Sequence, residues 1–353
     1  MKVYSNINDF VNEGGRIREG GAVVALGNFD GVHVGHAAVI RTAVERAREC
    51  GLTPVCYTFS NHPRNTGLDI ANGDEPVVKL ITNEEEKLEI IANLGMEICL
   101  SVPFDERVKN TPAEEFISDT LIKGLNARVL CCGFNYRFGA GAKGDVELVR
   151  KIADKLGEGE SARRLSVEPV ADVNINGELV SSSRIRELIQ RGEMEECASC
   201  LGRPYSLAGT VSPGNQIGHN LGFPTANFVA GKIMELPPNG VYYSKIRIIG
   251  EAERGVKADI EDVKADNKST CNHYWYSSIT NVGVKPTVEG SGKSLEKSVE
   301  THILDFEDDL YGQSVKLELL HFARPEQRFD SLDELRDQIE ADIGGAKAFF
   351  LAH

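Results

Sequence analysis

The sequence predicts two domains of different class: an α/β domain with a parallel sheet, followed by an all-β domain that forms an antiparallel β-barrel with a terminal helix. Two domains are expected because 353 residues exceed what one hydrophobic core usually organises. Strand-like and helix-like segments alternate up to about residue 190, and beyond it strand-like segments follow one another directly. This change of pattern marks the approximate domain boundary.

The alternation begins with an apolar run at 22–26, which is typical of a buried strand. Helical periodicity follows at 35–50, and Gly51 ends that helix. Further strands are expected at 54–59, 98–102 and 128–133. Strands separated by helices in this way form a parallel sheet with helices on both faces, and such sheets bind ligands at the carboxyl ends of their strands.

Two further helices are predicted from their first residues. Thr82 to Glu85 read T-N-E-E, a capping box that would begin a helix ending near Leu94. Thr111 to Glu114 read T-P-A-E, with proline in the first turn, and would begin another.

The second half has strand-like runs at 206–211, 240–249, 277–282, 299–306 and 315–322, and a helix at 331–350. Consecutive strands with a single terminal helix indicate a small antiparallel barrel. The polar and charged stretch 251–273 is expected to be an excursion loop.

Composition narrows the class of function. A net charge of -14 argues against a nucleic-acid or membrane-surface binder, and no apolar run is long enough to cross a bilayer. The N-terminal residues lack the apolar core of a signal peptide, so a cytoplasmic protein with reduced cysteines is expected. Cys197 and Cys200 form an isolated C-x-x-C, and a zinc site would need a second pair.

The stretch GNFDGVHVGH, residues 27–36, falls between the first predicted strand and helix. Backbone N–H groups at a helix start bind anions, so His33 and His36 would face a triphosphate there as imidazolium donors. Two other interpretations are a metal site, for which no third ligand is near, and a turn whose two histidines have no role.

This stretch resembles the H-x-G-H motif of nucleotidyltransferases, in the form found in bacterial bifunctional riboflavin kinase/FMN adenylyltransferases (FAD synthetases). Seven more segments are similar to that family in the same order: CGFNYRFGAGAKGD (132–145), VSSSRIRELIQRG (180–192), GRPYSLAGTV (202–211), LGFPTANF (221–228), NGVYY (239–243), TNVGVKPT (280–287) and VETHILDFEDDLYG (299–312). The resemblance covers nearly the whole chain, apart from the excursion loop.

The resemblance implies a Rossmann-like nucleotidyltransferase domain over residues 1–187 and a riboflavin kinase domain over 188–353. The second domain would phosphorylate riboflavin to FMN with ATP and Mg²⁺. The first would join FMN to the AMP part of another ATP, giving FAD and pyrophosphate. These small molecules are the expected partners, with no nucleic acid and no membrane.

Site residues follow from the matched motifs. The nucleotide turn is expected to comprise Gly27, Asn28, Phe29, Asp30 and Gly35. Ser183 and Arg184, at the start of a helix, would hold the triphosphate.

The kinase residues come from the second half. Thr225 and Asn227 share one face of a strand, where with Pro224 they would bind ATP and supply oxygen ligands to Mg²⁺. Glu300 stands at the position of the catalytic base, which would deprotonate the primary ribityl hydroxyl. His302 would face the same way, with no role assigned to it.

Two segments depart from the family pattern. Asn135 stands where an aspartate is expected and Ala142 where an arginine is expected, and residues 60–63 read S-N-H-P instead of D-P-H-P. Two alternatives are left open, and the changes at Asn135 and Ala142 favour the first. One is a kinase whose adenylyltransferase half has decayed, and the other is a flavin-binding regulator without catalysis.

Overall fold

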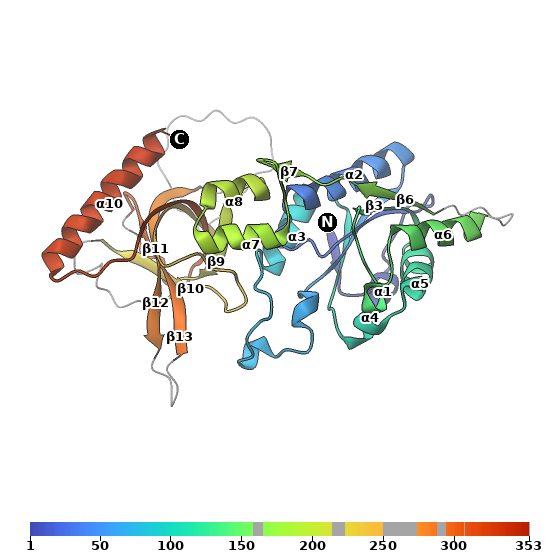
Figure 1. Cartoon of the computed structure of the whole chain (residues 1–353), viewed down its shortest axis with the longest axis horizontal. Coiled ribbons are helices and arrows are strands. Elements are labelled where there is room, and N and C mark those ends of the chain that lie inside the picture. The colour runs from blue at the N-terminus through green and yellow to red at the C-terminus, as the bar shows by residue number, and fades with distance from the viewer. Residues whose placement is uncertain (158–164, 214–222, 250–273, 288–293, 307, 353) are drawn as a thin grey trace. The chain divides into compact units, whose positions relative to one another are not determined.

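The computed structural model describes residues 1–157, 165–213, 223–249, 274–287, 294–306 and 308–352 (Figure 1). The chain forms two compact units: Met1–Ile185 with Cys200–Gly202, and Arg186–Ser199 with Arg203–His353. The excursion loop expected at 251–273 lies outside the described residues.

The first unit is built on a six-stranded sheet in which every neighbouring pair is parallel, as expected. Its order is β1-β4-β3-β2-β5-β6. The strands are β1 (Lys2–Tyr4), β2 (Ala22–Leu26), β3 (Thr53–Phe59), β4 (Ile98–Val102), β5 (Ala127–Gly133) and β6 (Ser166–Val170). Because β3 lies on one side of β2 and β5 on the other, the strand order reverses at β2, where ligands bind in such sheets.

Helices cover both faces of this sheet, because alternate residues of β2 pack into separate cores. Val24 joins a core that contains Ile117 and Leu121, whereas Val23 joins one that contains Ile40 and Ile91. The helices are α1 (Ile7–Asn12), α2 (Val34–Cys50), α3 (Glu84–Asn93), α4 (Glu106–Asn110), α5 (Ala113–Glu115), α6 (Val146–Gly157), a π-helix η3 (Phe116–Gly124), and short 3-10 turns η1 (Pro63–Asn65), η2 (Ile70–Asn72) and η4 (Ala140–Ala142).

The two predicted capping boxes were wrong in detail. Asn83, rather than Thr82, caps α3, and its side chain accepts the Glu86 N–H at 2.8 Å. Thr82 instead accepts the N–H of Gly31 at 3.2 Å, so it is occupied by a tertiary contact. No side chain caps α5, because its N-cap residue is Pro112, and the hydroxyl of Thr111 donates to a carbonyl of the preceding helix.

The second unit contains a six-stranded antiparallel sheet, in agreement with the predicted barrel. Its order is β10-β13-β12-β11-β14-β9. The strands are β9 (Tyr205–Thr210), β10 (Thr225–Val229), β11 (Gly240–Ile249), β12 (Tyr276–Thr287), β13 (Ser294–Ile303) and β14 (Ser314–Pro325). Just beyond β9, the N–H of Ser212 donates to the carbonyl of Asn227 in β10 at 2.7 Å, which joins the two edges of the sheet.

Among the described residues, three more helices and a small hairpin follow the parallel sheet or the barrel strands (Figure 1). They are α7 (Ser182–Arg191), α8 (Met194–Leu201), α10 (Leu332–Ala352) and the hairpin β7 (Asn174–Ile175) with β8 (Glu178–Leu179). A bidentate ion pair holds α10 to β14: Nε and Nη2 of Arg324 donate to the Asp342 carboxylate at 2.9 and 2.7 Å.

Alternate residues of the barrel strands face a buried interior. There the hydroxyls of Ser244, Ser278, Thr280 and Thr301 form a connected series, with oxygen–oxygen distances of 2.7 to 2.9 Å. All four residues are fully buried. Because hydroxyl groups both donate and accept, these buried polar atoms satisfy one another.

Candidate active sites

The segment 27–36 joins β2 to α2 at the carboxyl edge of the parallel sheet. Phe29 and Val32 have positive φ angles of 50° and 36°, which is uncommon for residues other than glycine. The buried Phe29 ring fills the space beside Gly27, where a Cβ atom would lie 2.6 Å from it. Gly27 is therefore required by packing, and Phe29 can offer a nucleotide only its backbone.

His33 and His36 lie against each other at the start of α2. Their rings are stacked, with centroids 3.6 Å apart. His33 caps the helix, because its Nδ1 accepts the backbone N–H of His36 at 3.2 Å. A neutral His33 therefore carries its proton on Nε2. A Cβ on Gly35 would come within 3.2 Å of the His33 ring, so this glycine makes room for it.

The protonation of His36 differs from the expectation of two imidazolium donors. Burial lowers the pKa of His36 well below its ordinary value, and the neighbouring His33 lowers it further. Its Nδ1 is buried and has no hydrogen-bond partner among the residues that the structure describes. Burial and the neighbouring His33 therefore favour a neutral imidazole for His36 at neutral pH.

The nucleotide turn is tied to segments far along the chain. A carboxylate oxygen of Asp30 accepts the N–H of Ile81 at 3.1 Å, and the Asp30 carbonyl accepts the Ser182 hydroxyl at 3.0 Å. The hydroxyl of Thr58 in β3 donates to the Asn28 carbonyl at 3.0 Å. Asp30 is buried, so its side chain holds the turn in place.

The hydroxyl-rich start of α7 lies beside this turn. The serine that contacts the turn is not the one expected from the sequence. Ser182 makes the contact with Asp30, and Ser183 is exposed. The Arg184 guanidinium binds the β7–β8 hairpin: Nη1 donates to the carbonyls of Ile175 and Glu178 at 3.1 and 3.0 Å. Its Nε also lies 3.1 Å from the Glu178 carboxylate, so Arg184 is an ordered cation with a carboxylate partner.

A buried lysine lies beside the turn and was not foreseen from the sequence. Lys87 of α3 helps to line a small pocket with Asn28, Asp30 and His62, and only 6% of its surface is exposed. Its ammonium donates to the Phe59 carbonyl at the end of β3. Burial lowers the pKa of Lys87, and the nearby Glu84 and Asp30 oppose that shift.

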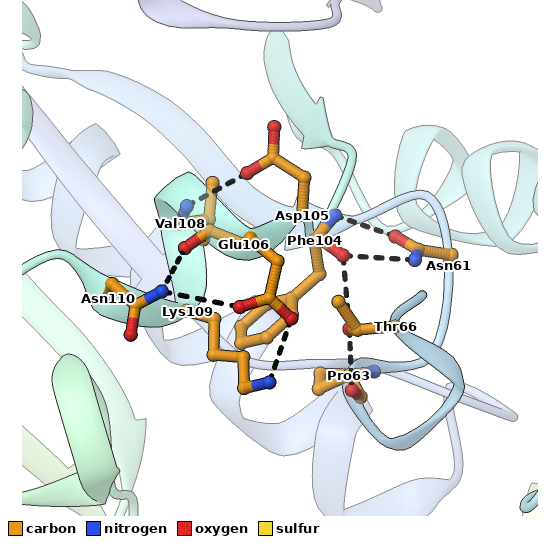
Figure 2. Close-up of polar contacts among 9 residues, drawn as sticks. All are labelled: Asn61, Pro63, Thr66, Phe104, Asp105, Glu106, Val108, Lys109 and Asn110. Atoms are coloured by element: carbon orange, nitrogen blue, oxygen red, sulfur yellow. Dashed lines mark hydrogen bonds and ion pairs between the residues drawn. The ribbon is translucent and has the colours of Figure 1, made fainter. Parts of the chain in front are cut away.

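Asn61 fixes the segment that departs from the family pattern. Its Nδ2 donates to the Phe104 carbonyl at 3.2 Å, and its Oδ1 accepts the Phe104 N–H at 2.6 Å (Figure 2). The hydroxyl of Thr66 donates to the same carbonyl at 3.1 Å. The Phe104 ring in turn packs edge-on against Phe59. A side-chain amide thus ties the chain after β3 to the chain after β4.

The second nucleotide segment follows β5, and both of its departures are on the surface. Asn135 is exposed. Ala142 is also exposed and has a φ of 55°, a left-handed conformation that a non-glycine residue rarely adopts. Lys143 lies beside it and is exposed as well.

The candidate kinase residues come together through strand register. Asn227 of β10 pairs with Glu300 of β13, and Glu300 pairs on its other side with Asn281 of β12. Register partners on antiparallel strands lie on the same face, so a carboxylate stands between two side-chain amides. Asn281 belongs to the segment 280–287, and the motif alone indicates no role for it.

Thr225 and Asn227 are prearranged within β10. The Asn227 Nδ2 donates to the hydroxyl and to the carbonyl of Thr225, each at 3.1 Å. With its nitrogen used in this way, the amide oxygen of Asn227 is the atom that would ligate a cation, next to the Thr225 hydroxyl. Pro224 is exposed and directly precedes the strand.

Other metal-binding arrangements are not found in the described part of the chain. No group of three or more His, Cys, Asp or Glu residues there could hold a metal ion. Cys197 and Cys200 are both buried. Among the described helices, none combines the length and the apolar character that crossing a bilayer requires.

Comparison with known proteins matches both halves of the chain. The family model described as FAD synthetase matches residues 16–184, and the one described as Riboflavin kinase matches residues 201–350. A protein of Escherichia coli (strain K12), named bifunctional riboflavin kinase/FMN adenylyltransferase, is 32% identical over 330 residues, which cover 94% of this chain and 93% of that protein. A Bacillus subtilis (strain 168) protein of the same name is 33% identical over 329 residues, covering 93% and 92%.

A solved structure agrees over the whole length. The crystal structure described as a macrolide-efflux protein from Streptococcus pneumoniae has a TM-score of 0.76 and 29% sequence identity, with 98% of each chain covered. Both halves, in the same order, therefore recur in proteins of about the same length.

Proposed function

The chain belongs to the family of bifunctional riboflavin kinase/FMN adenylyltransferases, and we propose on this basis that it catalyses both reactions named for the family. One is phosphorylation of riboflavin by ATP, giving FMN. The other is adenylylation of FMN by a second ATP, giving FAD and pyrophosphate. One observation carries the proposal: each matched half holds its own prealigned polar residues, His33 with His36 and Asn227 with Glu300.

We assign adenylyl transfer to residues 1–187 and the kinase reaction to residues 188–353, a division that the separate family matches support. Both reactions would take place in the cytoplasm, where ATP is supplied.

In adenylyl transfer, a phosphate oxygen of FMN attacks the α-phosphorus of ATP, and the bond from that phosphorus to the departing pyrophosphate breaks. No covalent intermediate with the protein is needed, so positioning and charge stabilisation carry the rate. His33 donates from Nε2, and a neutral His36 donates one N–H without needing to be charged. The nucleotide turn, Gly27 to Asp30 with Gly35, contributes backbone N–H groups at the start of α2.

The triphosphate would be held by Ser183 and Arg184. The contact between Arg184 and the Glu178 carboxylate supports this role, because a guanidinium that binds a carboxylate can also bind phosphate oxygens. Nucleotide binding would then exchange the Glu178 carboxylate for phosphate.

In the kinase reaction, Glu300 takes the proton of the primary ribityl hydroxyl as that oxygen attacks the γ-phosphorus of ATP, and ADP leaves. Pro224, Thr225 and Asn227 would hold the nucleotide. Mg²⁺ would be held by the Thr225 hydroxyl and the Asn227 amide oxygen, and it supplies neutralisation of phosphate charge. These hard oxygen donors fit Mg²⁺, which takes its remaining ligands from water and phosphate.

The test is a time course of the purified protein with riboflavin, excess ATP and Mg²⁺, with the flavins separated by chromatography. FMN should form first and then convert to FAD. Riboflavin that is bound but remains unchanged would overturn the proposal in favour of a flavin-binding regulator.

A kinase without adenylyltransferase activity is the second candidate. Ala142 favours it, because the arginine expected there would have added a cation to the nucleotide site. This candidate requires FMN to accumulate in the time course without conversion to FAD. Replacing Ala142 by arginine should then increase FAD formation.

A further inference from the structure

His302 lies next to both parts of the candidate kinase site. It follows Glu300 by two residues on β13, so the two side chains share one face of the strand. Across the sheet it pairs in register with Thr225, just as Glu300 pairs with Asn227. The chemistry proposed for this site gives His302 no part.

The contacts of His302 reach the chain just before β10. Its Nδ1 lies 2.9 Å from the carbonyl oxygen of Pro224. Because a carbonyl oxygen can only accept, the hydrogen must lie on Nδ1. The ring also packs edge-on against Phe223, with centroids 5.8 Å apart. His302 therefore holds the two residues that lead into Thr225.

We propose that His302 is a positioning residue of the kinase, which fixes the backbone at Phe223 and Pro224 so that Thr225 and Asn227 meet the nucleotide. This inference rests on the proposed function. The hydrogen bond between the Asn227 amide and Thr225 sets the two ligands relative to each other. The register with β13 begins at Thr225, so it does not hold the residues before the strand. The bond from His302 to Pro224 holds the chain there.

The reaction already has a candidate base on this face, because Glu300 supplies a carboxylate there. His302 uses its Nδ1–H to bind a backbone carbonyl, so its contact holds the chain at Pro224. His302 therefore acts on the nucleotide through Pro224 and Thr225, and not on the reacting hydroxyl.

Two substitutions of His302 distinguish a positioning role from the role of a general base. In asparagine the amide nitrogen is attached to Cγ, as Nδ1 is in histidine, so His302→Asn can keep the bond to Pro224. In glutamine the amide nitrogen lies one carbon further out, at the position of Nε2 in histidine. His302→Gln therefore loses the hydrogen bond to Pro224. Neither side chain can serve as a general base.

In kinase assays, His302→Gln should raise the KM for ATP about three- to tenfold, the factor expected for one hydrogen bond. Its kcat at saturating ATP should change less than about twofold. His302→Asn should stay within about twofold of the wild type in both constants. If both variants instead lose about a hundredfold or more in kcat, His302 is a catalytic residue and the proposal is overturned. If His302→Gln leaves KM unchanged, the proposal is overturned as well.

A binding measurement tests the inference without turnover. Trp275 is the single tryptophan of the chain and lies in the kinase unit, under the guanidinium of Arg247. Its fluorescence therefore follows thermal unfolding of that unit alone. ADP with Mg²⁺ should raise the unfolding temperature of the wild type, because a ligand that binds only the folded state stabilises it. The rise should shrink in His302→Gln and persist in His302→Asn.

Controls distinguish failure of the inference from failure of the proposed function. Glu300→Gln should lose FMN formation and keep the full rise with ADP and Mg²⁺. Unfolding without ligand shows whether each variant is folded. A wild type that forms no FMN and gains no stability from ADP and Mg²⁺ would overturn the proposed function, and the inference with it. A wild type that forms FMN, with equal stabilisation in both His302 variants, would overturn the inference alone.

Discussion

The two candidate sites are built in opposite ways. In the first unit, the site is a turn whose polar groups are buried and held by distant segments. Asp30 is bonded to residues 51 and 152 positions away in the sequence. In the second unit, Asn227, Glu300 and Asn281 occupy adjacent strands, and the strand register aligns them.

Because of this difference, we expect substitutions in the first site to affect stability more than substitutions in the second. His33 and Asp30 are 6% and 5% exposed, and a change at either disturbs the packing of its unit. Glu300 is only half-buried on the outer side of its strand. We therefore expect substitutions of His33 or Asp30 to affect folding and activity together, and substitution of Glu300 to affect mainly activity.

Glu300→Ala is the sharpest test of the second site. It should lower the rate of FMN formation by roughly 10²- to 10⁴-fold, as expected for loss of a general base. The rate of FAD formation from added FMN should be unchanged, and so should the unfolding temperature. A Glu300→Ala protein that is fully folded but loses both activities would show that the two reactions do not have separate sites.

His36→Ala should have the reverse effect. FAD formation from FMN should fall by roughly 10²- to 10³-fold, because a donor to charge developing in the transition state is lost. FMN formation should continue at the wild-type rate. Measuring both reactions on the same preparation checks this, and equal loss of both would contradict the assignment.

Lys87→Met tests whether the first site also stabilises the fold of the first unit. It should lower the free energy of unfolding of the first unit by about 3 kcal/mol, because the buried carboxylate of Asp30 and the nearby carboxylate of Glu84 lose their neighbouring cation. Denaturant unfolding followed by circular dichroism measures this loss. Lys151→Met is the matched control, since Lys151 is exposed and should change stability by no more than about 0.5 kcal/mol. If the two substitutions lower the free energy of unfolding equally, Lys87 has no particular structural role.

The depressed pKa of His36 predicts a smaller effect of pH on the first unit. Below the ordinary histidine pKa near 6.5, His36 binds a proton in the unfolded chain but not in the folded chain. Stability is therefore lost as the pH falls from 6.5 towards the folded pKa, by up to about 1.4 kcal/mol per pH unit. Unfolding measured between about pH 7 and pH 5 should show a shallower slope for His36→Gln than for the wild type. Identical slopes would mean that His36 binds protons equally in both states.

Local patterns predicted the elements well. The run at 22–26 is β2, and the helix expected to stop at Gly51 does so, since this residue adopts a φ of 67° there. The parallel sheet and the antiparallel barrel were both confirmed. The strand expected at 299–306 begins earlier and ends at Ile303, because strand ends depend on pairing with β12 rather than on composition.

What the sequence did not predict depends on contacts between distant segments. Thr82 was expected to cap a helix, but it binds Gly31, 51 residues away. The role of Asn61 depends on Phe104, 43 residues away. Lys87 had no local pattern to identify it, since its burial follows from how α3 packs beside β3. Residues whose role is local, such as His33 as a helix cap, could have been found from the motif.

The alternation along β13 has a consequence for how this chain can change over evolution. Glu300 faces outward beside Asn227, whereas Thr301, the next residue, is part of the buried hydroxyl series. Inserting or deleting one residue upstream within the strand would exchange the two faces, placing a carboxylate in the interior and a threonine in the site. Insertions and deletions among descendants of this sequence should therefore be confined to positions outside the strand, even where individual residues are substituted.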